Sequence, residues 1–138
     1  MYIIIIGCGR VGSKLAHDFS ASKADVVVID KSRKALSRLA APFNGRTIIG
    51  DALDLNVLHE AGIESCDAIF LLTGNENFNL VVGQVAQKMF KVKKVIVQMF
   101  SFPKEAVFRN RGFTIINRTN LFLDKFKDCL KDKVESRE

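Results

Sequence analysis

Residues 1–30, which read MYIIIIGCGRVGSKLAHDFSASKADVVVID, decide the fold of this chain. The run Tyr2–Ile6 is apolar and mostly β-branched, a pattern typical of a strand buried on both faces of a parallel sheet. A glycine-rich turn at residues 7–12 and a segment with helical spacing follow, and the apolar run Asp25–Ile29 ends the stretch. This order predicts a strand, a helix and a second strand parallel to the first.

The remainder of the chain continues the same alternation. Four more segments are strand-like: Arg46–Ile49, Ala68–Thr73, Lys94–Met99 and Phe113–Ile116. Helical spacing is found in Val11, Leu15 and Phe19, and in Val81, Val85 and Met89 with Leu80 and Gln84 beside them, while Pro103 suits a helix start. We therefore expect an α/β fold: a Rossmann-like, doubly wound, six-stranded parallel sheet in a single domain that spans residues 1–138.

Length and composition agree with one folded domain. The chain has 138 residues, of which 48% are hydrophobic and 26% charged, as in a globular protein. No apolar run approaches the roughly 18 residues that cross a bilayer, and no signal peptide is recognisable. The three cysteines, Cys8, Cys66 and Cys129, have no C-x-x-C spacing, which argues against a disulfide framework or a zinc site. We expect a protein of the reducing cytoplasm.

The net charge of +6 lies entirely in the last third of the chain. Residues 1–90 carry equal numbers of basic and acidic side chains, whereas residues 91–138 carry twelve Lys or Arg and six Asp or Glu. Such a surface can bind nucleic acid, an anionic membrane or an acidic partner, and a solvated, lysine-rich helix face gives the same count. Because interleaved exposed aromatic residues and a recognised motif are lacking, we expect no nucleic-acid partner.

The glycine-rich turn matches G-x-G-x-x-G, the fingerprint of a dinucleotide-binding strand, turn and helix. Gly7 permits the tight turn, Gly9 lets the backbone approach a pyrophosphate, and Gly12 lets the helix pack on the strand. The helix N-terminus then offers free N–H groups to the phosphates. Asp30, at the end of the second strand, completes the fingerprint because its carboxylate can accept hydrogen bonds from both hydroxyls of an unphosphorylated ribose.

Two further features concern the ribose and the base. Lys31 and Arg33 keep a 2′-phosphorylated ribose, as in NADP, open as the less favoured alternative. Asp51, in the step Gly50–Ala52 after the third strand, can reach an adenine amino group. It is equally well explained as the cap of a helix that begins near Asp54.

The sequence offers few residues that could serve as a catalytic acid, base or nucleophile beside a bound nucleotide. Its only tyrosine, Tyr2, lies in the first strand, which excludes a Tyr-x-x-x-Lys couple. His17 and His59 fall in predicted helices away from the carboxyl ends of strands, and we interpret them as surface or packing residues. Cys8 lies in the glycine turn, where a thiol more often packs away from the ligand than reacts. We expect a protein that is not an enzyme.

Six stretches together have the pattern of one family: residues 7–12, Val28–Asp30, Gly50–Ala52, Leu72–Thr73 with a helix that begins near Asn75–Asn79, the strand Val95–Gln98 and the turn Phe108–Gly112. On these residues the chain resembles the N-terminal nucleotide-binding domain of the Trk/Ktr potassium-uptake regulators, the RCK or TrkA-N domain. The resemblance covers essentially the whole chain. An arginine within the glycine turn together with the Gly-Asp-Ala step is specific to this family.

The resemblance implies a ligand, partners and a site. Such proteins form dimers and then octameric rings on the cytoplasmic side of a membrane potassium channel or transporter, where the bound nucleotide changes the shape of the ring and the ring gates the pore. The implied ligand is an adenine nucleotide (ATP, ADP or AMP) or NAD(H). The site residues expected are Gly7, Cys8, Gly9, Arg10, Val11, Gly12, Asp30, Lys31, Gly50, Asp51, Ala52, Thr73 and Gly74.

Arg10 takes a specific role in this resemblance. In relatives the arginine at this place lies near the terminal phosphate of a nucleotide, in some cases one bound by the neighbouring subunit. A guanidinium binds a γ-phosphate through two parallel charge-assisted hydrogen bonds, so Arg10 could distinguish ATP from ADP or NAD. The alternative is an exposed arginine in the first turn of the helix.

The chain also departs from the family. Many relatives continue into a C-terminal ligand-binding lobe, whereas this chain ends at Glu138; it is either a separate regulatory subunit, with a second RCK-type subunit supplying the lobe, or a cloned domain. Arg109 stands where relatives often carry an acidic residue that helps to bind a cation, so we expect no metal site there. Gln98 stands where a basic residue is common, which weakens any phosphate contact inferred for that strand.

Residues 119–134 predict an amphipathic helix, with Phe122, Phe126, Cys129 and Leu130 on one side and lysines elsewhere. In the family this helix crosses to a partner subunit, and the alternative is that it packs on its own sheet. We favour self-association, because so small a sheet leaves apolar faces to cover.

Two enzyme classes are alternatives to a regulatory subunit. The first is a minimal NAD(P)-dependent oxidoreductase whose substrate site forms between subunits, and the missing acid–base pair counts against it. The second is a methyltransferase, which shares the glycine turn and the acid of the second strand. Methyltransferases typically add an antiparallel seventh strand, and nothing after Ile116 has that pattern.

Overall fold

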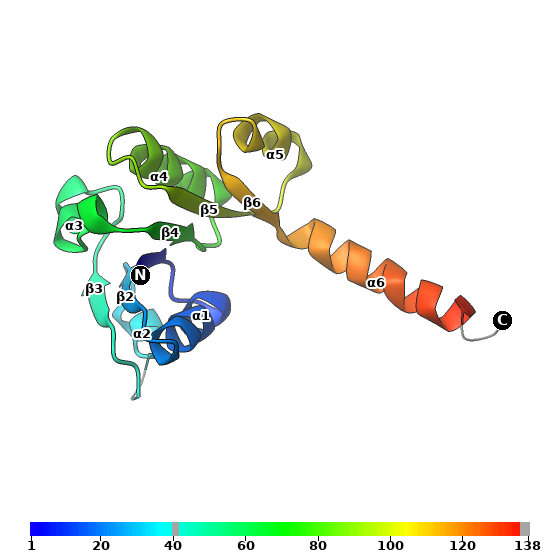
Figure 1. Ribbon diagram of the computed structural model, residues 1–138, viewed down its shortest axis with the longest axis horizontal. Helices are drawn as coiled ribbons and strands as arrows, with labels where there is room; N and C mark the ends of the chain where they lie inside the picture. Colours follow the sequence, from blue (N-terminus) through cyan, green and yellow to red (C-terminus); the bar gives the residue numbers. More distant parts are fainter. Residues whose placement is uncertain (40–41, 136–138) are drawn as a thin grey trace.

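Six parallel strands form one sheet in the computed structural model, which describes residues 1–39 and 42–135 (Figure 1). In chain order they are β1 (Tyr2–Ile6), β2 (Asp25–Asp30), β3 (Arg46–Ile49), β4 (Ala68–Leu71), β5 (Lys94–Met99) and β6 (Thr114–Asn117). Their spatial order is β3-β2-β1-β4-β5-β6, so the direction of winding reverses between β1 and β4. The predicted Rossmann-like fold is confirmed, with β4 two residues shorter and β6 one residue later than expected.

Helices connect the strands and cover both faces of the sheet. They are α1 (Arg10–Ala21), α2 (Arg33–Leu36), α3 (Leu55–Glu60), the 3-10 turn η1 (Ile63–Ser65), α4 (Glu76–Lys88), α5 (Phe102–Arg109) and α6 (Arg118–Glu135). The helices α1 and α2 lie on one face of the sheet, and α3, α4 and α5 lie on the other (Figure 1). Ser32, Asp54 and Asn75 begin α2, α3 and α4, because each side chain accepts a hydrogen bond from a backbone N–H of the first turn.

The apolar sequence of β1 follows from burial on both faces. Ile4 and Ile6 belong to the cluster under α3 and α4, whereas Ile3 and Ile5 belong to the cluster under α1. All four side chains are at most 3% exposed. Because β1 also pairs with β2 on one side and β4 on the other, it has no solvent-facing position between Ile3 and Ile6.

The helical spacing located α1 and α4 correctly but selected several residues that do not face the sheet. Val11, Val81 and Met89 are 43%, 46% and 57% exposed. The buried residues of these helices are mostly smaller: Gly12 and Ala16 in α1, and Asn79, Leu80, Val82, Gly83 and Ala86 in α4. Small side chains let the helix axes approach the strands closely, and a pattern of large apolar residues does not reveal them.

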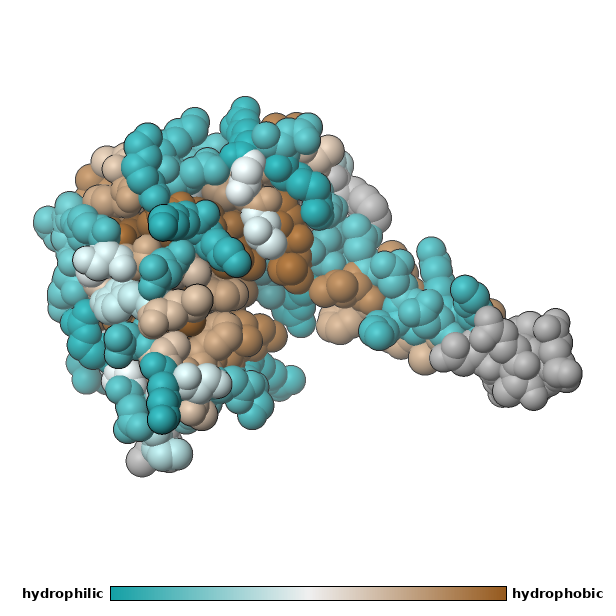
Figure 2. Space-filling view, viewed as in Figure 1, coloured by the Kyte–Doolittle hydropathy of each residue, from teal (hydrophilic) through white to brown (hydrophobic). Residues whose placement is uncertain are grey.

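The last helix, α6, extends away from the sheet (Figure 1). Every residue from Leu121 to Lys131 is exposed, and Phe122, Phe126 and Leu130 are 55%, 73% and 68% exposed. Apolar side chains are visible along α6 and on the adjoining side of the domain in Figure 2. The alternative in which this helix packs on its own sheet is therefore wrong. No helix within residues 1–39 and 42–135 is long and apolar enough to cross a membrane.

One face of the sheet is only partly covered. On the side of α1, Phe70 of β4 and Ile96 of β5 line a groove of about 540 Å³ together with Phe19 of α1. Ile116 of β6 is 42% exposed. The strands β4, β5 and β6 thus present apolar side chains that the helices of the described chain cover only in part.

The backbone contact at Gly12 gives a stability prediction. A Cβ at residue 12 would lie 1.9 Å from the Gly7 carbonyl oxygen, whereas a Cβ at Gly74 would meet nothing within 4 Å. We expect Gly12→Ala to lower the free energy of unfolding by about 1–3 kcal/mol or more, because α1 must move off β1. Gly74→Ala is the matched control and should change it little. Urea denaturation measures both, and equal stability of the two variants would contradict this account of the packing.

Candidate functional site

A pocket of about 390 Å³ lies at the carboxyl ends of β1, β2, β3 and β4. It is lined by Ile6, Gly7, Cys8, Gly9, Ile29, Asp30, Lys31, Ala35, Arg38, Gly50, Ala52, Leu72, Thr73, Gly74, Asn75 and Phe78. This is the point at which the winding of the sheet reverses, where open α/β sheets bind their ligands. The lining combines apolar side chains with a few charged and polar groups, the usual composition of a small-molecule site.

The glycine turn forms the wall of the pocket beside α1. Gly7 has a φ of +107°, and a Cβ there would lie 2.9 Å from the backbone of Leu72 and Thr73, so only glycine fits. Gly9 begins α1 without a side-chain cap, and a Cβ at Gly9 would meet nothing within 4 Å. This helix end thus lines the pocket without a side-chain cap, an arrangement suited to an anionic group.

Asp30 connects the glycine turn to the turn after β2. Its Oδ2 accepts a hydrogen bond of 2.8 Å from the backbone N–H of Cys8, and its Oδ1 accepts one of 2.8 Å from the N–H of Ser32. A carboxylate has about four lone-pair sites, so two N–H donors leave acceptor capacity for ligand hydroxyls. Asp30 is thereby held in place before a ligand arrives.

Lys31 crosses one side of the pocket. Its Nζ lies 3.5 Å from Oδ2 of Asp51 and 5.4 Å from the centre of the Phe78 ring. Asp51 also accepts a hydrogen bond from the N–H of Leu53, but it does not cap a helix: the cap of α3 is Asp54. Asp51 therefore holds Lys31 at the edge of the pocket and is not itself one of the lining residues.

A buried polar cluster supports the opposite wall. Asn79 of α4 is fully buried, and its Oδ1 accepts hydrogen bonds from the N–H and the hydroxyl of Thr73. Its Nδ2 donates to the carbonyl of Thr73 and to that of Gln98 in β5. The amide of Gln98, 5% exposed, donates to the carbonyls of Leu72 and Thr73. Two buried amides thus fix the turn between β4 and α4.

The structure brings most of the predicted site residues together. Gly7, Cys8, Gly9, Asp30, Lys31, Gly50, Ala52, Thr73 and Gly74 line the pocket, whereas Arg10, Val11, Gly12 and Asp51 do not. Arg10 and Val11 are exposed on the first turn of α1, and Gly12 is buried against β1.

Sequence reasoning missed several lining residues, among them Ala35, Arg38, Asn75 and Phe78. Asn75 had a signal, because asparagine is a preferred cap for the helix expected to begin near Asn75–Asn79, whereas Phe78 had none. Arg38 had none: it follows the four-residue helix α2 outside any motif.

The surroundings of Cys8 disfavour the thiolate form of its side chain. Burial raises its pKa above the ordinary value of 9.0, and the neighbouring Asp30 carboxylate raises it further, against an opposing effect of Arg38. Burial likewise raises the pKa of Cys66 to about 11. Both thiols are therefore protonated at neutral pH. Within the described residues no three His, Cys, Asp or Glu side chains gather into a possible metal site.

The other candidate acids and bases lie outside the pocket. The hydroxyl of Tyr2 donates to the carbonyl of Ala61. His17 packs edge-on against Phe43, and His59 pairs with Glu64. Among the described residues that line the pocket, the ionisable side chains are Asp30, Lys31, Arg38 and the protonated Cys8.

Comparisons with known proteins agree with this geometry. A family model described as the TrkA-N domain matches residues 3–118. The Trk system potassium uptake protein TrkA of Streptomyces coelicolor is 34% identical over 116 residues, which are 84% of this chain and 52% of that protein. The chain spans about half the length of the curated relatives it matches, or less.

Solved structures share the fold at low sequence identity. The TrkA-N domain of the inner membrane protein ybaL from Escherichia coli is similar with a TM-score of 0.83 at 22% identity, over 94% of this chain and 96% of that one. The Kef CTD of Shewanella denitrificans in its AMP-bound form is similar with a TM-score of 0.72 at 17% identity, over 99% of this chain and 79% of that one.

Proposed function

Since the chain belongs to the TrkA-N domain family, we propose that it is a non-enzymatic, nucleotide-binding domain that regulates a membrane potassium channel or transporter. The observation that carries the proposal is the pocket, where an uncapped helix N-terminus, the open space at Gly9 and the Asp30 carboxylate converge. The relative from Streptomyces coelicolor, named as a potassium uptake protein, supports the partner class.

The ligand we propose is an adenine nucleotide (ATP, ADP or AMP) or NAD(H). Its phosphates would lie before the N-terminus of α1, where the N–H groups and the helix dipole favour negative charge. Its ribose hydroxyls would donate to Asp30, and its base would lie on the side of Ala52 and Phe78. The AMP-bound form of the Shewanella domain, which shares the fold, supports this ligand class.

The absence of catalysis is part of the proposal. The lining offers an anchored carboxylate, two cations and a protonated thiol, and the hydroxyl of Tyr2 is occupied elsewhere. Binding can then act only by favouring one conformation of the protein over another. We place the domain at the cytoplasmic face of the membrane, held there by its transport partner, with a second RCK-type subunit as the source of any further lobe.

The nucleotide site is tested by Gly9→Val and Asp30→Ala. A valine at residue 9 would occupy the open space that we assign to the phosphates, so calorimetry should show no AMP, ADP or NAD binding while the unfolding temperature stays close to that of the wild type. Removing the Asp30 acceptor should weaken each of these nucleotides by about 1.5–3 kcal/mol. Unchanged affinities in both variants would refute the site.

Arg10 is proposed to discriminate between nucleotides by contacting a third phosphate. It is exposed at the first residue of α1, directly after Gly9. Arg10→Ala should then weaken ATP by about 1.5–3 kcal/mol more than AMP, with a smaller difference at high salt if the contact is exposed. Dissociation constants for both ligands at two ionic strengths check this. Equal losses for ATP and AMP would assign Arg10 no part in discrimination.

Self-association through α6 is proposed to build the dimer. Support comes from its exposed apolar residues and from the partly covered apolar side chains of β4 and β5 on the same chain, two surfaces that a second copy can bury. Phe126→Asp should convert the dimer to a monomer in sedimentation velocity. Met89→Asp, on another exposed apolar side chain, is the control and should not. A dimer that survives Phe126→Asp at the same concentrations would place the interface elsewhere.

A further inference from the structure

The direction in which α6 leaves the domain is set at its first turn. The helix has 18 residues and is therefore about 27 Å long. From Leu121 to Lys131 its residues are exposed, so contacts that could orient α6 are concentrated at residues 118–120. A tilt of about 10° at the first turn would move the far end of such a helix by about 5 Å. Whatever fixes the first turn fixes where Phe126 and Leu130 are presented.

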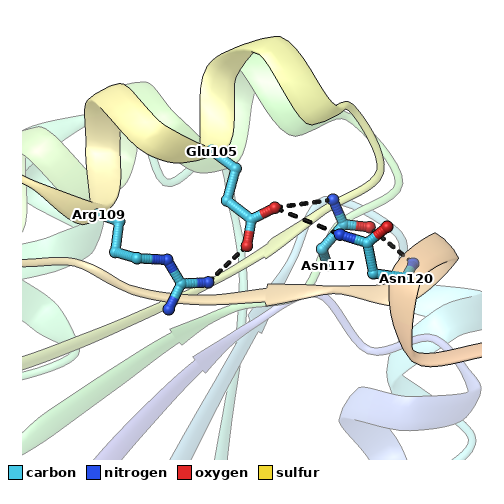
Figure 3. Close-up of polar contacts among 4 residues, drawn as sticks. All are labelled: Glu105, Arg109, Asn117 and Asn120. Carbon is cyan, nitrogen blue, oxygen red and sulfur yellow. Dashed lines mark hydrogen bonds and ion pairs between the residues drawn. The ribbon is translucent and has the colours of Figure 1, made fainter. Parts of the chain in front are cut away.

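Glu105 joins three elements at this point (Figure 3). Its Oε2 accepts hydrogen bonds from Nδ2 of Asn117, at 3.2 Å, and from Nδ2 of Asn120, at 3.5 Å. Its Oε1 accepts a hydrogen bond from the guanidinium of Arg109. Glu105 and Arg109 belong to α5, Asn117 is the last residue of β6, and Asn120 lies in the first turn of α6. One carboxylate thus contacts α5, β6 and α6.

The cluster is closed by Asn117. Its Oδ1 accepts a hydrogen bond of 3.1 Å from the backbone N–H of Asn120 and so caps α6, while its Nδ2 donates to Glu105. Asn117 is 5% exposed and the side chain of Glu105 is 17% exposed. Water therefore cannot readily take over the hydrogen bonds between these side chains. A tilt of α6 would break the Asn120 contacts and leave buried polar groups unpaired, which is unfavourable.

The remaining contacts of the first turn are weaker constraints. The hydroxyl of Thr119 donates to the carbonyl of Phe100 at 3.4 Å, and the guanidinium of Arg118 lies 5.7 Å from the centre of the Phe100 ring. The first is long and exposed, and the second permits a range of orientations. The directional restraint comes from Asn117, which caps the first turn at 3.1 Å, and from Glu105, which holds the amide of Asn117 and also contacts Asn120.

We propose that Glu105 is a positioning residue whose carboxylate fixes the angle between α6 and the sheet, and with it the direction of the apolar face of α6. Arg109 balances the charge of Glu105 from the solvent side, where its own side chain is 57% exposed. The inference goes beyond the proposed function: it concerns the geometry of each chain, with or without a bound nucleotide.

Distances between two spin labels on one chain test the proposal. Cys129 on α6 is exposed, whereas Cys8 and Cys66 are buried, so one label can be attached to the natural Cys129 and the other to Lys88→Cys at the end of α4. Labelled chains are diluted into an excess of unlabelled Cys129→Ser chains, so that only distances within a chain are measured. With Glu105 intact, the distance distribution should have one narrow maximum.

Three variants and one control give the expected outcomes. Glu105→Ala and Asn120→Ala should each broaden the distribution or shift it by about 3 Å, because Cys129 lies about 17 Å along α6 and a tilt of about 10° moves it that far. Glu105→Gln, which keeps an amide oxygen as acceptor, should lie between them and the wild type. Glu60→Ala, on an exposed acid of α3, should leave the distribution unchanged. Wild-type distributions in both alanine variants would overturn the proposal.

Two further measurements show whether the variants are folded and which of the two proposals a negative result contradicts. Circular dichroism and thermal unfolding show whether each variant is folded, and Asn120→Ala carries the test if Glu105→Ala is not, because it removes only the contact on α6. Calorimetry with AMP on the wild type separates the two proposals. Lack of AMP binding would contradict the nucleotide site alone, and unchanged distances would contradict the role of Glu105 alone.

Discussion

The structure depends on the lack of a side chain where α1 meets the first strand. The Gly7 carbonyl oxygen occupies the place that a Cβ at residue 12 would need, and the backbone of Leu72 and Thr73 does the same at Gly7. The helix can therefore begin directly against β1, with its N-terminus at the carboxyl end of the sheet. The same turn leaves open space at Gly9, so the packing of α1 and one wall of the candidate site belong to a single stretch of backbone.

Asp30 turns this backbone arrangement into a preorganised site. Its two oxygen atoms accept hydrogen bonds from the backbone N–H groups of Cys8 and Ser32, which lie in different turns. The carboxylate therefore holds both turns together in the free protein. Fixing these groups in the free protein reduces the ordering that binding would otherwise require. On the far side of the pocket Asn79 and Gln98 do the same for the turn at Thr73. The walls are thus fixed by hydrogen bonds from side chains of two strands and one helix, Asp30 of β2, Gln98 of β5 and Asn79 of α4.

The sequence predicted the parts of this arrangement that depend on local chemistry. The glycine spacing, the apolar strands and the acid at the end of β2 follow from backbone geometry within about 30 residues, and the sequence predicted their positions correctly. Arg38, Phe78 and Asn79 were missed because their roles arise only when distant segments meet. Asn79 is polar and fully buried, a combination that periodicity cannot distinguish from an exposed position. The exposed Val81 and Met89 show the converse error, since an apolar step of four residues does not say which face touches the sheet.

The carboxyl end of β5 connects the pocket to the base of α6. The side chain of Gln98 donates to the carbonyls of Leu72 and Thr73 in the pocket wall, and two residues later the carbonyl of Phe100 accepts the hydroxyl of Thr119 in α6. Since β5 is hydrogen-bonded to both β4 and β6, a displacement of the turn at Thr73 must either break the contacts of Gln98 or move β5 with it. Breaking them would leave buried amides unpaired, which is unfavourable. The wall of the pocket and the base of α6 thus both contact residues at the carboxyl end of β5.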